Sequence, residues 1–122
     1  MKTNPPLKAT IKSDPKGIQV RFAPEGESSI RVVPVRIVLD FDRLGAVIGI
    51  EIISLRHFAG ENALPSARGS LTGEPVRFTY DAEADAAYLS LEDERSTDQR
   101  SVDGWLEIGA DGHLLGIGAA LK

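Results

Sequence analysis

The chain contains no cysteine and only two histidines among its 122 residues. Without cysteine the protein can form neither a disulfide framework nor a thiolate metal site, and a thiol nucleophile is excluded. Such a composition suits a reducing compartment, so we expect a cytoplasmic protein. The first residues hold no apolar run of roughly seven or more, and we therefore expect neither a signal peptide nor a membrane anchor.

Motifs for catalysis and for nucleotide binding are also missing. His57 and His113 do not occur in a Ser-x-His, Cys-His or His-Glu-x-x-His arrangement. Glycine pairs such as Gly112-x3-Gly116 are not followed by a helix that could present N–H groups to a phosphate. We therefore predict no catalytic residue, no cofactor and no nucleic-acid partner, and we favour a protein without enzymatic activity.

The formal net charge of −4 is unevenly distributed along the chain. Residues 1–75 carry ten Lys and Arg against eight Asp and Glu, whereas residues 76–122 carry four against ten. An acidic half repels nucleic-acid phosphate and attracts basic surfaces at low ionic strength. This asymmetry indicates either a basic protein partner or an ordinary solubilising surface.

An internal repeat with an offset of 67 positions is the clearest pattern in the chain. The run Val35-x3-Leu39-x5-Gly45-x3-Gly49-Ile50 matches Val102-x3-Leu106-x5-Gly112-x3-Gly116-Ile117. Such a match is typical of one supersecondary unit used twice, because a small sheet cannot bury its apolar face alone. We predict a first repeat over 9–55, a connector over 56–75 and a second repeat over 76–122, all within one domain.

Apolar residues alternate with polar ones through most of both repeats, which is typical of half-buried strands. Asp111-Gly112 between two alternating runs predicts a hairpin, because glycine adopts positive φ without steric cost. We expect a short helix over 55–59 at the start of the connector. By the alternation, Leu39 and Leu106 belong to the core.

These patterns predict an all-β fold. We expect two four-stranded antiparallel meanders, related by the internal repeat and packed as a sandwich or a partly closed barrel. Four strands of about 50 residues would be marginal alone, so the two apolar faces must cover each other.

Three stretches of the second repeat resemble the bacterial domain of unknown function 2283 family: Tyr80-Asp81-Ala-Glu83-Ala-Asp85-Ala-Ala-Tyr88, Val102-Asp103-Gly104-Trp105-Leu106-Glu107 and Gly112-His-Leu-Leu115-Gly116-Ile117. The resemblance is clear over about 76–118 and degenerate over about 9–55, where Gly49-Ile50-Glu51-Ile52 persists but the acidic turn is replaced. The family has no established activity. Because short members are often encoded beside small toxin-like proteins, the resemblance implies an antitoxin-like role.

A candidate partner-binding face follows from the alternation in the second repeat. Tyr88, Trp105 and Leu114 point away from the predicted core, and Trp105 lies between Asp103 and Glu107 on the same side. An outward tryptophan needs cover, which the connector (through Phe58), another subunit or a ligand could supply. We therefore take Tyr88, Trp105, Asp103 and Glu107 as the candidate contact surface.

The acidic turn is a second candidate site. Asp81, Glu83 and Asp85 have the spacing that opens a calcium loop, but Ala86 occupies the sixth position, where such a loop requires glycine. We predict no metal, and Asp81 and Asp85 can instead cap the turn through backbone N–H groups. These three residues could also converge with Tyr80 and with Glu51 in a pocket between the repeats.

Three functions remain open from the sequence. The first is a non-enzymatic module that binds a protein, most plausibly a basic one, in an antitoxin-like regulatory role. The second is a small-molecule binder or enzyme with a pocket between the repeats, where Gly116 and Gly118 leave space. The third is a structural homodimer in which Trp105 stacks across a two-fold axis.

Overall fold

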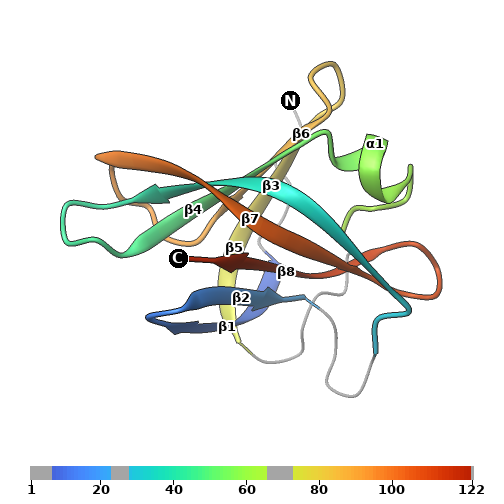
Figure 1. The fold of residues 1–122 in the computed structure, drawn as a ribbon, viewed down its shortest axis with the longest axis horizontal. Coiled ribbons are helices and arrows are strands. Elements are labelled where there is room, and N and C mark those ends of the chain that lie inside the picture. The colour runs from blue at the N-terminus through green and yellow to red at the C-terminus, as the bar shows by residue number, and fades with distance from the viewer. Residues whose placement is uncertain (1–6, 23–27, 66–72, 122) are drawn as a thin grey trace.

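A computed structural model describes residues 7–22, 28–65 and 73–121. Within these ranges the chain forms eight strands and one helix: β1 (Leu7–Asp14), β2 (Gly17–Arg21), β3 (Arg31–Phe41), β4 (Val47–Ile53), α1 (Leu55–Ala59), β5 (Glu74–Asp81), β6 (Ala86–Ser90), β7 (Asp98–Ile108) and β8 (Leu114–Ala120). The strands join in one closed barrel with the order β1-β2-β8-β7-β3-β4-β6-β5 (Figure 1). The predicted all-β class and the predicted barrel are confirmed, and so is the helix over 55–59.

A two-fold relation connects the two halves of the barrel. Strands β1, β3 and β4 begin 67 positions before β5, β7 and β8, and β2 begins 69 positions before β6 because the turn before β6 is longer. Exchanging each strand for its counterpart leaves every neighbour relation in the barrel unchanged. In the longest ladder, between β3 and β7, Arg36 faces its own counterpart Asp103, so the axis passes between these two residues.

The strand order differs from the predicted meanders. Among the described strands, β2 pairs with β8 instead of β3, and β6 pairs with β4 instead of β7. Every contact between hairpins therefore joins one half of the chain to the other. Two separate meanders would leave exposed edges, whereas interleaved hairpins close the barrel and give each strand two neighbours.

The same turns and irregularities recur in both halves. Gly45 and Gly112 adopt φ of 84° and 87° in the β3–β4 and β7–β8 hairpins, which confirms the hairpin predicted at Asp111-Gly112. The ladders of these hairpins shift register at equivalent places, between Asp40 and Phe41 and between Glu107 and Ile108. A bulge adds one residue to a strand and changes which side chains face inward. The outward orientation predicted for Leu114 is therefore wrong, since this side chain belongs to the core.

Apolar side chains from both halves fill the barrel. The predicted core residues Leu39 and Leu106 are counterparts, and both are fully buried. The largest of the other fully buried side chains are Phe22, Ile37, Ile50, Ile52, Leu55, Leu89, Ile108, Leu114 and Ile117. Within the described part of the chain, no helix has the length and apolar character needed to cross a membrane.

We predict that Leu39→Ala and Leu106→Ala each lower the free energy of unfolding by about 2–5 kcal/mol, because each leaves a cavity in a close-packed interior. Denaturant unfolding followed by circular dichroism measures this loss. Leu44→Ala is the control, since Leu44 lies in a turn with 86% of its surface exposed. Core variants that unfold like the parent protein would contradict the assignment of these residues to the interior.

Candidate functional site

Exposed apolar side chains gather on the outer surface of β3 and its neighbours. Ile30, just before β3, and Val32 and Pro34 within it lie at alternate positions facing outward. Val32 is 58% exposed, and Ile53 at the end of β4 (49%) and Phe58 on α1 (51%) are similarly exposed. We call the set Ile30, Val32, Pro34, Ile53, Phe58 and Trp105 the apolar strip. Such a cluster differs from singly scattered apolar residues, which need no explanation.

A groove of about 410 Å³ lies between β3 and α1, at the part of the strip that Pro34, Ile53 and Phe58 form. Pro34, Ile53 and Phe58 supply its apolar walls, and Arg36 and Asp103 lie at its edge. Arg36 Nη1 donates to Asp103 Oδ1 at 2.7 Å, and both side chains are well exposed. The predicted contact residue Asp103 therefore borders the groove with its charge already paired.

Trp105 lies on β7, opposite Pro34 of β3, and its side chain rests on the next strand, β8. Its cross-strand neighbour there is Gly118, where an added Cβ would overlap the indole ring. The partial cover that a tryptophan requires thus comes from a glycine backbone, and Phe58 packs against His57, with ring centroids 4.9 Å apart. Gly118 does not open a cavity, because the indole occupies its space.

Glu107, another predicted contact residue, is engaged within the barrel wall. It lies on the outer side of β7 and reaches over Gly116 to β2. Its carboxylate accepts hydrogen bonds from Gln19 Nε2 at 3.0 Å and from Arg21 Nη1 at 2.8 Å. With only 13% of its side chain exposed, Glu107 has little surface to offer a partner.

In the other half Asp40 is the counterpart of Glu107, and Tyr88 binds it. Its hydroxyl donates to Asp40 Oδ2 at 2.7 Å, and Gln99 Nε2 donates to the other oxygen of the same carboxylate at 2.7 Å. The tyrosine lies over Gly49, where a Cβ would overlap its hydroxyl. Burial, and then the hydrogen bond to Asp40, raise the pKa of Tyr88 far above its ordinary value. The phenol is therefore a structural donor.

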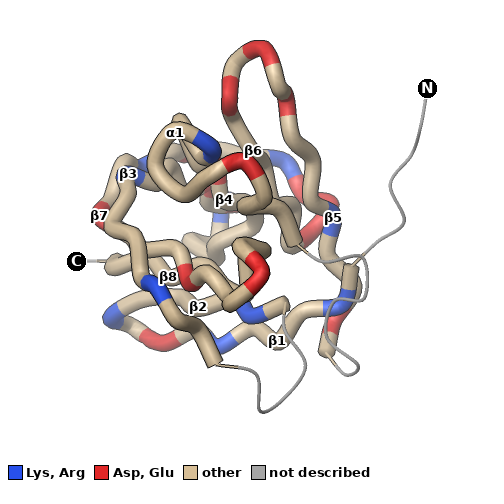
Figure 2. The backbone as a smooth tube through the Cα atoms, turned by 90° about the vertical axis from the view of Figure 1, so that its right-hand side faces the viewer, with Lys and Arg blue, Asp and Glu red and all other residues tan. Residues whose placement is uncertain are grey.

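The predicted pocket residues separate into two groups. Glu51 pairs with Tyr88 across the outer surface of β4 and β6. Tyr80, Asp81 and Asp85 lie instead around the β5–β6 turn, where Asp81 Oδ1 accepts the N–H groups of Glu83 at 3.0 Å and Ala84 at 3.4 Å. In Figure 2 this turn projects from the barrel as a strongly acidic loop next to α1.

Asp85 reaches from this turn to α1. Its carboxylate accepts the backbone N–H groups of Arg56 at 2.8 Å and His57 at 3.0 Å, and the hydroxyl of Tyr80 at 2.6 Å. Partial burial opposes its ionisation, but these hydrogen bonds outweigh burial and hold the pKa of Asp85 below its usual value. The hydrogen bond to Asp85 also raises the pKa of Tyr80. The sequence pattern indicated a cap here, but gave no sign that the capped element would be α1.

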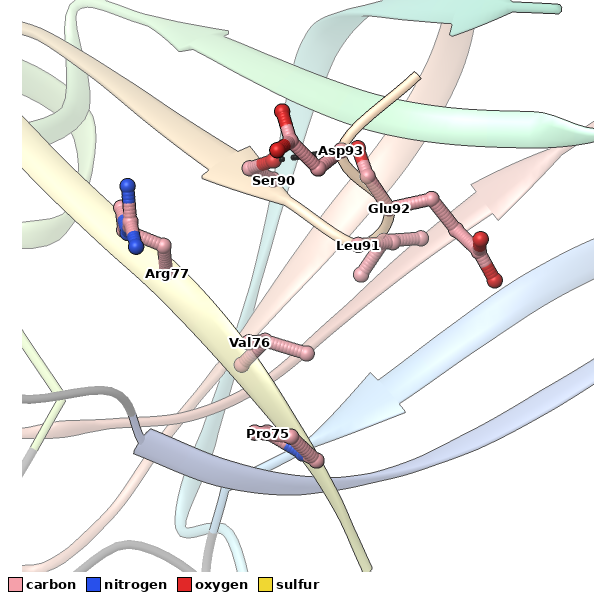
Figure 3. A pocket seen from close by; sticks show the side chains of 7 residues that line it. All are labelled: Pro75, Val76, Arg77, Ser90, Leu91, Glu92 and Asp93. Atoms are coloured by element: carbon pink, nitrogen blue, oxygen red, sulfur yellow. Dashed lines mark hydrogen bonds between the residues drawn. The ribbon is translucent and has the colours of Figure 1, made fainter.

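Two further open grooves lie elsewhere on the described part of the barrel. One of about 310 Å³ lies at the β5–β6 edge, where Arg77, Glu92 and Asp93 point in different directions (Figure 3). The other, of about 480 Å³, lies at the β3–β4 turn and is lined by Arg43 and Arg100 among others. Within the described ranges, no three His, Asp or Glu side chains come together in a way that could hold a metal ion.

Sequence reasoning missed several residues of this surface. Asp40 accepts the hydrogen bond of Tyr88, but the sequence indicates only that it is a polar residue on the outward side of a strand. Val32 and Pro34 precede the repeated motif, and their exposure follows from the pairing of β3 with β7, which has no local signal. The partner of Glu107, Arg21, lies 86 positions away.

We predict that Gly118→Ala displaces Trp105 and increases acrylamide quenching of its fluorescence. The added methyl group overlaps the indole, and overpacking of this kind costs about 1–3 kcal/mol. Gly49→Ala is the matched control, because its methyl group meets Tyr88 instead. Equal quenching in Gly118→Ala and the parent protein would show that the tryptophan does not rest on this glycine.

We also predict that Asp85 stabilises the protein near neutral pH and loses this effect in acid. Folding lowers the pKa of this carboxyl group, so its ionised form stabilises the native state at every pH above its ordinary pKa of 3.8. This stabilisation disappears as the pH falls through the lower pKa of the folded protein. Thermal melting of the parent protein and Asp85→Asn should therefore differ at about pH 7 and converge in strong acid. A difference that persists unchanged in acid would contradict the assignment.

No curated protein and no solved structure matches the chain. One family does match: it is described as "Protein of unknown function (DUF2283)", and the matched residues, 77–118, run from β5 into β8. The match lies in the second half of the chain and confirms the family resemblance of the second repeat.

Proposed function

We propose that this barrel is a non-enzymatic module that binds another protein through the apolar strip. The observation that carries the proposal is the exposure of Ile53 and Phe58, which line one groove, and of Val32, two positions before the groove residue Pro34 on β3; each side chain exposes about half of its surface or more. Exposed apolar clusters of this kind, rimmed by polar residues, are typical of protein–protein contact sites. Trp105 and Pro34 add a rigid centre of the type that dominates binding energy.

Charge favours a basic partner. The acidic β5–β6 turn lies directly against α1, since Asp85 O accepts the N–H of Leu55 at 3.2 Å. Asp81 and Glu83 on this turn are exposed, so they flank the end of the strip with negative charge. A basic surface docking on the strip would meet this turn, and complementary charge would speed association. An antitoxin-like role, in which the module covers the working surface of a basic protein, is compatible with this arrangement.

Catalysis is less well supported by the same geometry. The carboxylates of Asp40, Asp85 and Glu107 already accept hydrogen bonds from neighbouring side chains, and the hydroxyls of Tyr80 and Tyr88 donate to two of them. A general acid or base needs an open side towards a substrate. Nor do Gly116 and Gly118 leave the space expected for a pocket, because the side chains of Glu107 and Trp105 lie on them.

The proposal predicts a companion protein that is lost when the strip is altered. Val32→Lys removes apolar surface, repels a basic partner and places the new charge beside Glu107, its neighbour on β7, so the fold is preserved. Leu44→Lys is the matched control, because it also replaces an exposed apolar side chain with lysine but lies in a turn outside the strip. Affinity purification from the native host, followed by titration of the purified companion at increasing salt, measures the effect.

We expect one stoichiometric companion with the parent protein and with Leu44→Lys, and at least tenfold weaker binding with Val32→Lys. Association should slow as the salt concentration rises, because exposed charges are screened. A companion that both variants retain would place the contact elsewhere. Recovery of a protein without any companion, strictly monomeric at all salt concentrations, would contradict the proposal, and a salt-independent dimer would indicate self-association instead.

A further inference from the structure

The β5–β6 turn is the place where the second half of the barrel departs from the first. In the first half only Pro15 and Lys16 separate β1 from β2, and Asp14 Oδ1 accepts the N–H groups of Lys16 and Gly17. Its counterpart Asp81 caps the equivalent turn in the same way. The second turn is two residues longer, however, and Asp85 in it has no counterpart.

The additional residue adopts a left-handed backbone conformation. Asp85 has a φ of 51°, in the left-handed region that non-glycine residues rarely enter. This conformation directs its carbonyl to Leu55 N–H and its carboxylate to the N–H groups of Arg56 and His57. Local backbone strain of this kind persists where the surrounding structure over-determines it. All three of these N–H groups belong to α1, which follows the first half of the chain.

Tyr80 and Arg56 complete the attachment. The Tyr80 hydroxyl donates to the same Asp85 oxygen that accepts from Arg56 N–H, and the Arg56 guanidinium stacks 4.6 Å from the centre of the Tyr80 ring. At its other end α1 is held by β3, because Arg31 Nη2 donates to Ala59 O at 2.5 Å. The short helix is thus fixed between the acidic turn and the strand that carries the apolar strip.

The position of α1 decides the shape of the groove. Ser54, just before the helix, and Phe58 within it form one wall, and Pro34 and Val35 on β3 form the other. A helix of five residues is not stable by itself, so its place depends on Leu55 and Ala59, which are buried in the core, and on the groups that satisfy its N–H donors. Among the described side chains, Asp85 satisfies two of them.

We infer that Asp85 is the positioning residue of the docking groove: from the second half of the chain it anchors α1, and through α1 it sets Phe58 against β3 for the partner. This inference rests on the proposed docking surface. The acidic turn then does more than cap itself, because its residue Asp85 holds α1 in place. The shape of a groove lined mainly by the first half of the chain therefore depends on a residue of the second half. Asp85 itself need not touch the partner.

Asp85→Asn in the full chain tests the inference. Asparagine tolerates the left-handed conformation, so the backbone is not strained. It offers only one acceptor oxygen, and its NH₂ group would face the His57 N–H that Asp85 Oδ2 now accepts. We expect hydrogen-exchange protection of the Arg56 and His57 amides to fall at least tenfold, and by more than that of Leu39 and Leu106 in the core, whose protection follows global stability.

Asp81→Asn is the matched control, because Asp81 belongs to the same turn and accepts two N–H groups that are not on α1. Its α1 amides should keep parental protection. The parent protein should also lose protection of α1 in acid as Asp85 becomes protonated, whereas Asp85→Asn should show no such step. Unchanged protection of α1 in Asp85→Asn would overturn the positioning role without any reference to a partner.

Binding of the companion separates this inference from the proposed function. We expect Asp85→Asn to weaken binding at least tenfold and Asp81→Asn to weaken it much less. If Val32→Lys abolishes binding but Asp85→Asn, with α1 loosened, binds like the parent, the docking surface stands and the positioning role is wrong. If Val32→Lys binds like the parent, the docking surface itself is wrong, whatever Asp85 does to α1.

Discussion

The ladder between β3 and β7 is the constraint on which the rest of the barrel depends. It is the longest pairing, with eleven residues on each strand, and it joins the two halves at their two-fold axis. All other hairpin contacts also cross between the halves, so neither half has a sheet of its own. Cooperative folding of the two halves follows, because each hairpin finds its neighbours only in the other half. The apolar strip lies on the outer side of this same ladder, where it is held by the most extensive pairing in the molecule.

Equivalent positions of the two halves carry the same geometry with different chemistry. Asp40 and Glu107 are counterparts, each directly opposite a glycine of the next strand, and each accepts a hydrogen bond from counterpart residues, Tyr88 and Gln19. A Cβ on Gly116 would crowd the Glu107 carboxylate, and a Cβ on Gly49 would overlap the Tyr88 hydroxyl that donates to Asp40, so each contact crosses the strand over a glycine. In an exact repeat, two identical residues would face each other at the two-fold axis. In this chain the residues there are Arg36 and Asp103, whose opposite charges form an ion pair. The two halves thus share the same glycine positions and strand pairings, whereas the side chains at equivalent positions differ and pair with each other.

The sequence predicts the local structure well and the long-range structure poorly. Alternation and turn chemistry are local, and they correctly indicate the strands, the Asp111-Gly112 hairpin and the α1 helix. Strand order depends on pairing across the chain, for which a single sequence holds no signal, and so the meanders were wrong. The bulge beside Ile108 moved Leu114 into the core by shifting the parity on which the prediction relied. For the candidate site, parity placed Trp105 correctly outward, but the engagement of Glu107 by Arg21 required knowing that β2 lies beside β8.

The asymmetry between the halves is concentrated where the proposed function is. In each half the turn of the second hairpin contains a glycine with positive φ, Gly45 or Gly112. The turn of the first hairpin is capped in each half by an aspartate, Asp14 or Asp81. The second half has the longer acidic turn, α1 follows the first half, and these two elements contact each other through Asp85. The contact of the acidic turn with α1 closes one side of the groove, so the proposed partner site lies where the described halves differ. A single partner site on a two-fold scaffold therefore requires a departure from symmetry, and the pairing of Asp85 with α1 provides it.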